Sequence, residues 1–198
     1  MPHYHSSAPG GCLQYFTGTS GQVKTFNFDA TEGTHLRNQV YSSCIRQEAG
    51  RHFKMFGALF SYPKIPLTWR WILYTISRSG YCCVEYSVCK DEGSFSLYTN
   101  DGTSLLETEC TSDYVRIEGA ASSCQAMPLA HINKFCGDFL STTTGLNAGN
   151  DIVCDCSAPF AVGISTDELS DDGTAGTAND AAAARSKGLC LNYKQIPC

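Results

Sequence analysis

The aspartate in the stretch ECTSDYVRI, residues 109 to 117, stands where a side chain can do chemistry. Asp113 follows Cys110 by three residues and directly precedes 114–117, whose alternating side chains are typical of a strand. A carboxylate at the mouth of a strand can bind a metal ion, cap a turn or lie in water. These three roles stay open until the chain supplies partners for Asp113.

The cysteines predict an oxidising, extracellular compartment. They are twelve, an even number spread over nearly the whole 198-residue chain, at 12, 44, 82, 83, 89, 110, 124, 136, 154, 156, 190 and 198. Such a count is typical of a secreted, disulfide-bonded domain. A structural zinc site is disfavoured because no C-x-x-C pair occurs and Cys154 and Cys156 are only two residues apart.

Charge and motifs disfavour several classes of function. The net charge of −5 argues against nucleic-acid binding, which needs clustered Lys and Arg. The stretch 55–76, the most apolar candidate for a membrane span, is interrupted by prolines and charges. His131 lies five residues before Cys136, as in a Cys–His nucleophile pair. No nucleophile elbow, H-E-x-x-H or P-loop motif accompanies that pair, so we expect no enzyme.

The hydrophobic pattern predicts an all-β domain. Short apolar runs are separated by Gly, Ser, Thr, Asn and Asp, which is typical of a sandwich or barrel. We expect strands at 23–28, 40–45, 84–88, 95–98, 114–117, 160–165 and 189–193. The polar segment 168–187 has no hydrophobic stripe and is interpreted as a mobile loop.

One segment differs from the rest of the chain. Residues 51–80 hold five Lys or Arg, both tryptophans, and no acidic residue or cysteine. Two interpretations stay open. The segment is either a long hairpin or loop insertion, or the translation of a retained intron whose excision would join SCIRQEAG to YCCVEYSVC. Residues 1–11, MPHYHSSAPGG, have no apolar core and are interpreted as a tail rather than a signal peptide.

Several ordered motifs resemble a CUB domain, and secreted CUB proteins of arthropods in particular. They are GGCLQYFTGTSG, YSSCIRQ, CTSDYVRI, KFCGD, PFAVGISTDE and GLCLNYKQ, and they cover residues 12–198 apart from 51–80. The resemblance implies a two-sheet antiparallel sandwich of about ten strands, the jelly-roll form of an all-β fold. It also implies the disulfides Cys12–Cys44 and Cys110–Cys136, which would leave Cys136 without a thiolate. The pairing of the other eight cysteines stays open. Cys190 stands where the family often has Phe.

The same resemblance implies a calcium site. Many CUB domains bind calcium at one end of the sandwich, and Asp113 and Asp167 match two of the ligand positions. Glu107 and Glu109 both precede Cys110, and either can be the third ligand; Asn100 and Ser165 are further oxygen donors. Calcium takes six to eight oxygen ligands, several of them carboxylates. The alternative is that Asp113 only caps a turn.

The expected function is that of an extracellular, non-enzymatic recognition module. In CUB domains that hold calcium, the ion orders loops that capture a Lys or Arg of a protein partner. A structural, matrix-type secreted protein and an accessory domain of a larger secreted protease are the alternatives. An acidic docking site for a cation would be sensitive to salt and, if calcium is its cofactor, to chelators.

Overall fold

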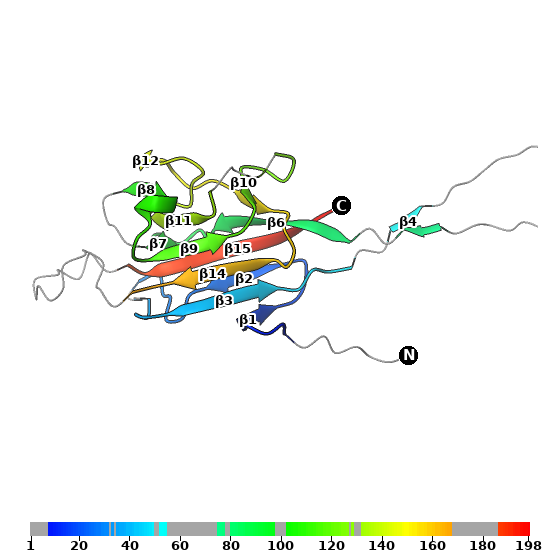
Figure 1. Cartoon of the computed structure of the whole chain (residues 1–198), viewed down its shortest axis with the longest axis horizontal. Helices are drawn as coiled ribbons and strands as arrows, with labels where there is room; N and C mark the ends of the chain where they lie inside the picture. The colour runs from blue at the N-terminus through cyan, green and yellow to red at the C-terminus, as the bar shows by residue number, and fades with distance from the viewer. Residues whose placement is uncertain are drawn as a thin grey trace, which may run out of the picture.

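The computed structural model describes residues 8–31, 33, 35–49, 80–97, 102–126, 128, 132–167 and 186–198, and the backbone of two short strands at 52–54 and 75–77. Two sheets face each other as the layers of a sandwich (Figure 1). Residues 168–185 of the predicted loop 168–187, most of the insertion 51–80, Asn100 and His131 lie outside the described residues, and so do the predictions that concern them.

The first sheet has the strand order β1-β3-β14-β9-β11-β8-β12. Its strands are β1 (Cys12–Phe16), β3 (Val40–Ile45), β14 (Ala161–Ser165), β9 (Tyr114–Ile117), β11 (Lys134–Gly137), β8 (Thr103–Leu106) and β12 (Gly145–Leu146). Its neighbouring strands are antiparallel except for β1 and β3, which pair in parallel. The fold is therefore antiparallel-rich rather than wholly antiparallel.

The second sheet has the order β10-β13-β6-β15-β2, with β7 paired to β15. Its strands are β10 (Ala120–Ala121), β13 (Val153–Asp155), β6 (Tyr81–Val88), β15 (Gly188–Pro197), β2 (Ser20–Lys24) and β7 (Phe95–Ser96). A separate pair joins β4 (His52–Lys54) to β5 (Thr75–Ser77). One 3-10 turn, η2 (Glu107–Glu109), lies between β8 and β9.

The core lies between the facing sheets. Side chains alternate along each strand, so that Val115 and Ile117 of β9 point inward, as do Val162 and Ile164 of β14. They belong to one cluster with apolar residues of the second sheet, namely Val84, Tyr86, Leu189 and Leu191. The all-β sandwich predicted from the sequence is thus confirmed.

The strand predictions differ in quality. The strands 40–45 and 114–117 are confirmed with the same bounds. The prediction of a strand at 23–28 was wrong, because β2 ends at Lys24 and the chain then turns, with Asn27 in the left-handed region at φ 62°. The strands β1, β8, β10, β11, β12 and β13 were missed; each has five residues or fewer.

Six disulfides cross-link the sandwich. They include the two pairs that the resemblance implied, Cys12–Cys44 and Cys110–Cys136. The remaining bridges are Cys82–Cys198, Cys83–Cys156, Cys89–Cys190 and Cys124–Cys154. Cys190 is therefore used in a second-sheet bridge between the end of β6 and β15.

A buried glutamine fastens one end of the sandwich. Gln195 of β15 is 2% exposed, and its amide nitrogen donates to the carbonyls of Gly18 and Arg46 at 2.8 Å each. Its amide oxygen accepts the backbone N–H of Glu48 at 2.9 Å. One side chain thus joins the β1–β2 turn, the end of β3 and the last strand.

Replacing Gln195 with alanine should destabilise the domain. The substitution leaves three backbone groups without their partner, and each unpaired buried group costs about 1–3 kcal/mol unless water reaches it. We expect the free energy of unfolding to fall by about 2–4 kcal/mol in denaturant titrations of the oxidised protein. Gln195→Glu, which keeps the acceptor but loses both donors, is the matched variant. A loss below ~0.5 kcal/mol for alanine would contradict this role.

The two ends of the insertion lie next to each other. The backbone N–H of Tyr81 donates to the carbonyl of Glu48 at 3.2 Å, and the side-chain amide of Gln47 donates to the carbonyl of Tyr81 at 2.5 Å. The N–H of Cys198 donates to the carbonyl of Gly80 at 3.0 Å. The described sandwich therefore closes without any strand from the insertion.

Deleting residues 51–79 should leave the sandwich intact. Ala49, Gly50 and Gly80 would then form a three-residue connection between Glu48 and Tyr81, a length that hairpins use with glycine present. Because loop closure costs less for a shorter loop, we expect unfolding free energy unchanged or raised by up to about 2 kcal/mol. The same deletion filled with a Gly/Ser linker of equal length is the control. A large loss of stability in both variants would show that the insertion packs on the domain.

Candidate functional site

Asp113 lies at the end of the first sheet where β3 begins and β14 ends, because the next residue, Tyr114, pairs with Ser165 and Ser165 pairs with Val40. Figure 1 shows this end of β3, β9 and β14. It directly precedes β9, and its side chain is buried, with 2% exposure for the residue. The turn before it begins with η2 and is fixed to β11 by the Cys110–Cys136 disulfide. The local sequence thus places a carboxylate inside the end of the molecule rather than in water.

Both carboxylate oxygens of Asp113 have partners. Oδ1 accepts the backbone N–H of Asp167 at 2.9 Å, and Oδ2 lies 2.9 Å from Nε2 of His35. The His35 side chain is 5% exposed. Asp113 therefore joins the start of β9 to the loop before β3 and to the loop after β14.

His35 carries its own set of contacts. Its Nδ1 lies 3.2 Å from the carbonyl oxygen of Leu36, and its backbone N–H donates to the carbonyl of Ser186 at 3.2 Å. Both ring nitrogens thus face acceptor oxygens, an arrangement that only the doubly protonated imidazolium satisfies at both atoms. His35 is a cationic partner of the Asp113 carboxylate when its imidazole ring is protonated.

Hydrogen bonds join the late loop, which follows β14 and holds Thr166 and Asp167, to the segment before β3. Thr166 and Gln39 exchange backbone hydrogen bonds at 2.8 and 3.1 Å, and the Thr166 hydroxyl donates to the carbonyl of Leu36 at 2.7 Å. The carbonyl of Asp167 accepts the N–H of Asn38 at 2.8 Å. These bonds hold the backbone of Asp167 beside Asp113.

Glu107 and Glu109, the two glutamates before Cys110, accept hydrogen bonds from different backbone groups. Glu107 adopts a left-handed backbone at φ 48°, and its Oε1 accepts the backbone N–H groups of Asn133 and, at 2.8 Å, Lys134. Glu109 is exposed, and its Oε2 accepts the N–H of Leu106 at 3.4 Å. Glu107 thus fastens the η2 turn to the start of β11, while Glu109 closes the turn itself.

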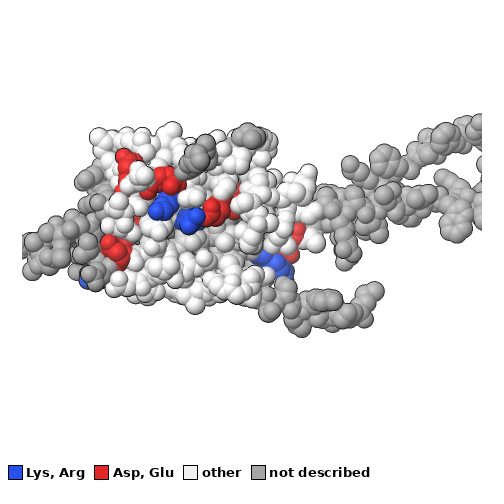
Figure 2. Space-filling view, viewed as in Figure 1, with Lys and Arg blue, Asp and Glu red and all other residues white. Residues whose placement is uncertain are grey.

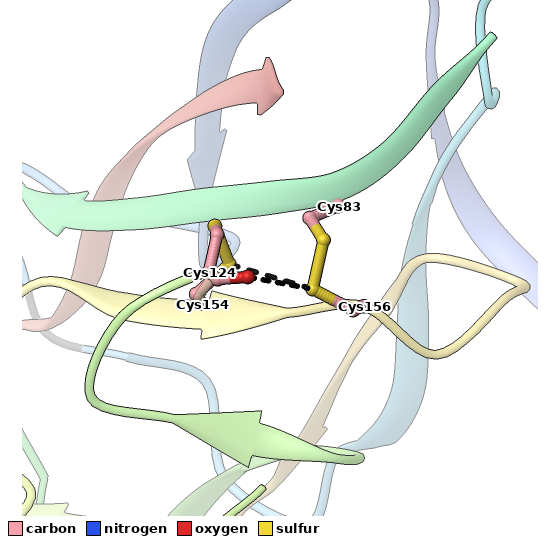
Figure 3. Close-up of side chains that lie close together, drawn as sticks. All are labelled: Cys83, Cys124, Cys154 and Cys156. Carbon is pink, nitrogen blue, oxygen red and sulfur yellow. Dashed lines mark hydrogen bonds between the residues drawn. A yellow bond between two sulfur atoms is a disulfide. The ribbon is translucent and has the colours of Figure 1, made fainter. Parts of the chain in front are cut away.

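These carboxylates do not gather into one ligand set. Among the described residues, the one group of three or more potential metal-ligating side chains with ligand atoms close together is Cys83, Cys124, Cys154 and Cys156 (Figure 3). Those sulfurs form two disulfides and offer no thiolate. No three of Asp113, Asp167, Glu107 and Glu109 form such a group in the described structure. Calcium binding stays a prediction of the resemblance.

The outer face of the first sheet carries its own charges. Figure 2 shows cationic side chains between acidic ones over β9 and β11, and a broad uncharged area over β3 and β14. The charged residues are already paired. The Arg116 guanidinium lies 2.5 Å from Glu118, and the Lys134 ammonium lies 4.6 Å from the centre of the Tyr114 ring. Ser165, half-buried on this face, pairs with Tyr114 and Val40 across the strands.

His35 is the site residue that the sequence did not reveal. It stands alone in TEGTHLRN, in a polar segment without periodicity and 78 positions before Asp113. Asp113 and Asp167, in contrast, were both named from their motifs, and the backbone of Asp167 lies next to the Asp113 carboxylate. The Cys–His nucleophile reading loses its thiolate, because Cys136 is bonded to Cys110.

Comparison with known proteins agrees with this architecture. The model of the animal CUB domain matches residues 9–196. A search of curated proteins finds no match. In the described part of the chain, no helix has the length and apolar character needed to cross a bilayer. Animal CUB domains are generally extracellular protein-interaction modules, typically without catalytic activity. With this match over nearly its whole length, the chain belongs to the CUB family.

Proposed function

We propose that this chain recognises a protein partner with the Asp113 end of its sandwich, and that the partner contributes a Lys or Arg side chain. The observation that carries the proposal is the bond from the Asp167 backbone to Asp113 at 2.9 Å. It fixes the loop after β14 against the start of β9, so that the end of the molecule presents a defined surface instead of independent loops.

The exposed side chains at this end fit a long cationic residue. Val40 is 85% exposed and Leu36 is 44% exposed, so this end offers apolar surface to a partner. Val40 pairs with Ser165, two residues before Asp167, and Leu36 accepts a bond from Thr166. Lys and Arg combine an apolar stem with a charged head, so one such side chain can cover an apolar surface and reach a carboxylate.

The net charge of −5 supports the same class of partner, because an acidic module attracts basic surfaces at long range. Calcium is the finer part of the proposal and is carried by the resemblance. Its binding would require the ion to compete with Nε2 of His35 for Asp113 Oδ2. A docking surface ordered by His35 needs no ion, so the two versions predict opposite responses to a chelator.

Calorimetry with short peptides tests the proposal. The probe is an uncharged peptide with one lysine, and the matched control is the same peptide with that lysine acetylated. We expect binding of the lysine peptide alone. Asp167→Asn should weaken it tenfold or more, the loss of about 1.4 kcal/mol expected for one charge-assisted contact. Glu118→Gln, which removes an exposed acid of the outer sheet face, should leave binding unchanged.

Each arm of the experiment decides one part of the proposal. Equal binding of both peptides, or an Asp167→Asn variant that binds like wild type, would overturn docking at this site. Titration of calcium into the chelator-treated protein addresses the ion. Heat that disappears in Asp113→Ala would make the docking calcium-dependent, and peptide binding that persists in chelator would remove calcium from the mechanism.

A further inference from the structure

Two disulfides lie in direct contact at the β10 edge of the second sheet (Figure 3). They are Cys83–Cys156 and Cys124–Cys154, and all four sulfur atoms lie within 4.8 Å of one another. The Cys154 and Cys156 sulfurs, which belong to different bridges, are 3.9 Å apart. Since disulfide sulfurs carry no proton, this is a van der Waals contact between two oxidised pairs rather than a hydrogen bond.

The register of the sheet creates this contact. Cys154 and Cys156 flank Asp155 and therefore point to the same face of the chain at β13. Cys83 of β6 lies across from Cys156, with a Cα–Cα distance of 4.0 Å. Cys124 follows β10, 5.2 Å from Cys154 between Cα atoms, and its carbonyl oxygen is 3.9 Å from the Cys156 sulfur. Cys124 is thus near both cysteines of the C-x-C pair.

The four cysteines differ in their access to solvent. Cys156 is exposed and Cys124 half-buried, whereas Cys83 is 8% exposed and Cys154 fully buried. A dissolved thiolate therefore reaches Cys156 first, while Cys154 can be attacked only from within the cluster. Sulfur atoms that the fold holds in contact exchange far faster than a protein sulfur and a dissolved thiol do, because the fold has already brought them together.

We propose that this cluster is a thiol-exchange site at which a small thiolate switches the protein between two disulfide pairings. The thiolate bonds to the Cys156 sulfur, the Cys83–Cys156 bond breaks, and its electron pair leaves on Cys83. The Cys83 thiolate then bonds to Cys154 and expels Cys124 as a thiolate. The Cys124 thiolate finally bonds to Cys156 and releases the original thiolate.

The products are Cys83–Cys154 and Cys124–Cys156, and no electrons are gained or lost overall. The thiol is a catalyst, so the switch needs no separate oxidant or reductant. The attachment of Cys124 moves two residues along the chain, from Cys154 to Cys156. Because β10 pairs with β13 through Ala120–Asp155 and Ala121–Cys154, this move changes the tether of an edge strand.

The carboxylate of Glu85 should slow the exchange. Its Oε1 lies 3.9 Å from the Cys124 sulfur. A neighbouring carboxylate disfavours a thiolate, so it opposes the step in which Cys124 leaves. Replacing Glu85 with Gln should therefore accelerate the exchange without changing the pairings that result.

The first experiment incubates the native, full-length protein with reduced glutathione, quenches it with acid and maps its disulfides by mass spectrometry. Cleavage before Asp155 separates Cys154 from Cys156, so each pairing has its own mass. We expect Cys83–Cys154 and Cys124–Cys156 to appear together, sooner in Glu85→Gln. A glutathione adduct on Cys156 with Cys124–Cys154 unchanged would overturn the proposal.

The second experiment needs no added thiol. In Cys156→Ser the Cys83 thiol is free and can exchange with Cys124–Cys154. Brief alkylation should label Cys124 in roughly one molecule in ten or more, if the two pairings differ by no more than ~1.4 kcal/mol. Cys12→Ser, whose free Cys44 lies outside the cluster, is the matched control and should be labelled at Cys44 alone. Folded circular dichroism spectra with label confined to Cys83 in Cys156→Ser would also overturn the proposal.

Discussion

Asp113→Ala is expected to lower the free energy of unfolding by about 2–5 kcal/mol, because two buried donors lose their acceptor and each unpaired buried group costs about 1–3 kcal/mol. The substitution leaves the His35 ring nitrogen and the Asp167 backbone N–H without their acceptor. Because His35 is 5% exposed in its side chain, water cannot easily replace the carboxylate. The loss is measured by denaturant unfolding of the oxidised protein, and the lysine peptide should no longer bind.

A matched series separates the two bonds of Asp113. Asp113→Asn keeps an amide oxygen for the Asp167 N–H and loses the charge that faces His35, so we expect a smaller loss than for alanine. His35→Gln removes the imidazole ring instead. If the two side chains act as a pair, the double variant Asp113→Asn/His35→Gln should cost less than the sum of the singles. Additive losses, or a cost below ~1 kcal/mol for alanine, would show that the pair does not hold this end.

The parts of the fold predicted from the sequence are those with local signals. The strands 40–45 and 114–117 were found because apolar residues alternate within them and turn residues bound them. Asp113 and Asp167 were found because each lies in a motif next to such a strand. The placement of both at one end follows from the antiparallel pairing of β9 and β14.

The missed parts depend on contacts between distant segments. Nothing near His35 shows that it lies against Asp113, since that contact forms only when the loop before β3 folds over the sandwich end. The parallel β1–β3 pair likewise has no signature in either strand. The eight cysteines left open could not be paired from spacing, because Cys82 and Cys83 are adjacent in sequence but bond to Cys198 and Cys156.

The second large effect concerns a carboxylate inside the second sheet. Asp155 is 1% exposed, and its Oδ1 accepts the backbone N–H and the hydroxyl of Ser157 at 2.7 and 2.6 Å. Its Oδ2 has no hydrogen-bond partner in the described structure. Burial raises the pKa of Asp155 to about 6, against the lowering effect of the Ser157 bonds and with a smaller contribution from Glu118. The folded protein thus binds the Asp155 proton more tightly than the unfolded chain does.

The direction of the pH effect follows from this shift. In the unfolded chain Asp155 has the ordinary value of 3.8, so the folded state holds its proton more tightly than the unfolded state. The resulting stability is present below that value and is lost as the pH rises through about 6. The difference between the two values corresponds to about 3 kcal/mol of unfolding free energy.

Asp155→Asn tests this effect, because asparagine keeps an acceptor for Ser157 and cannot ionise. We expect the unfolding free energy of wild type, relative to Asp155→Asn, to fall by up to about 3 kcal/mol between about pH 4 and about pH 7.5. The lowered pKa values of Glu48 and Asp151 change stability in the opposite direction, but they are present in both proteins and cancel in the difference.

Ser157→Ala sharpens the same test. It removes the hydroxyl that donates to Oδ1, so the carboxylate form loses a stabilising bond and the pKa of Asp155 should rise further. The pH at which stability falls should then move upward, while Asp155→Asn/Ser157→Ala should show no such step. Parallel pH profiles for wild type and Asp155→Asn would mean that Oδ2 reaches water or a donor, and that the carboxylate of Asp155 is not destabilised by its burial.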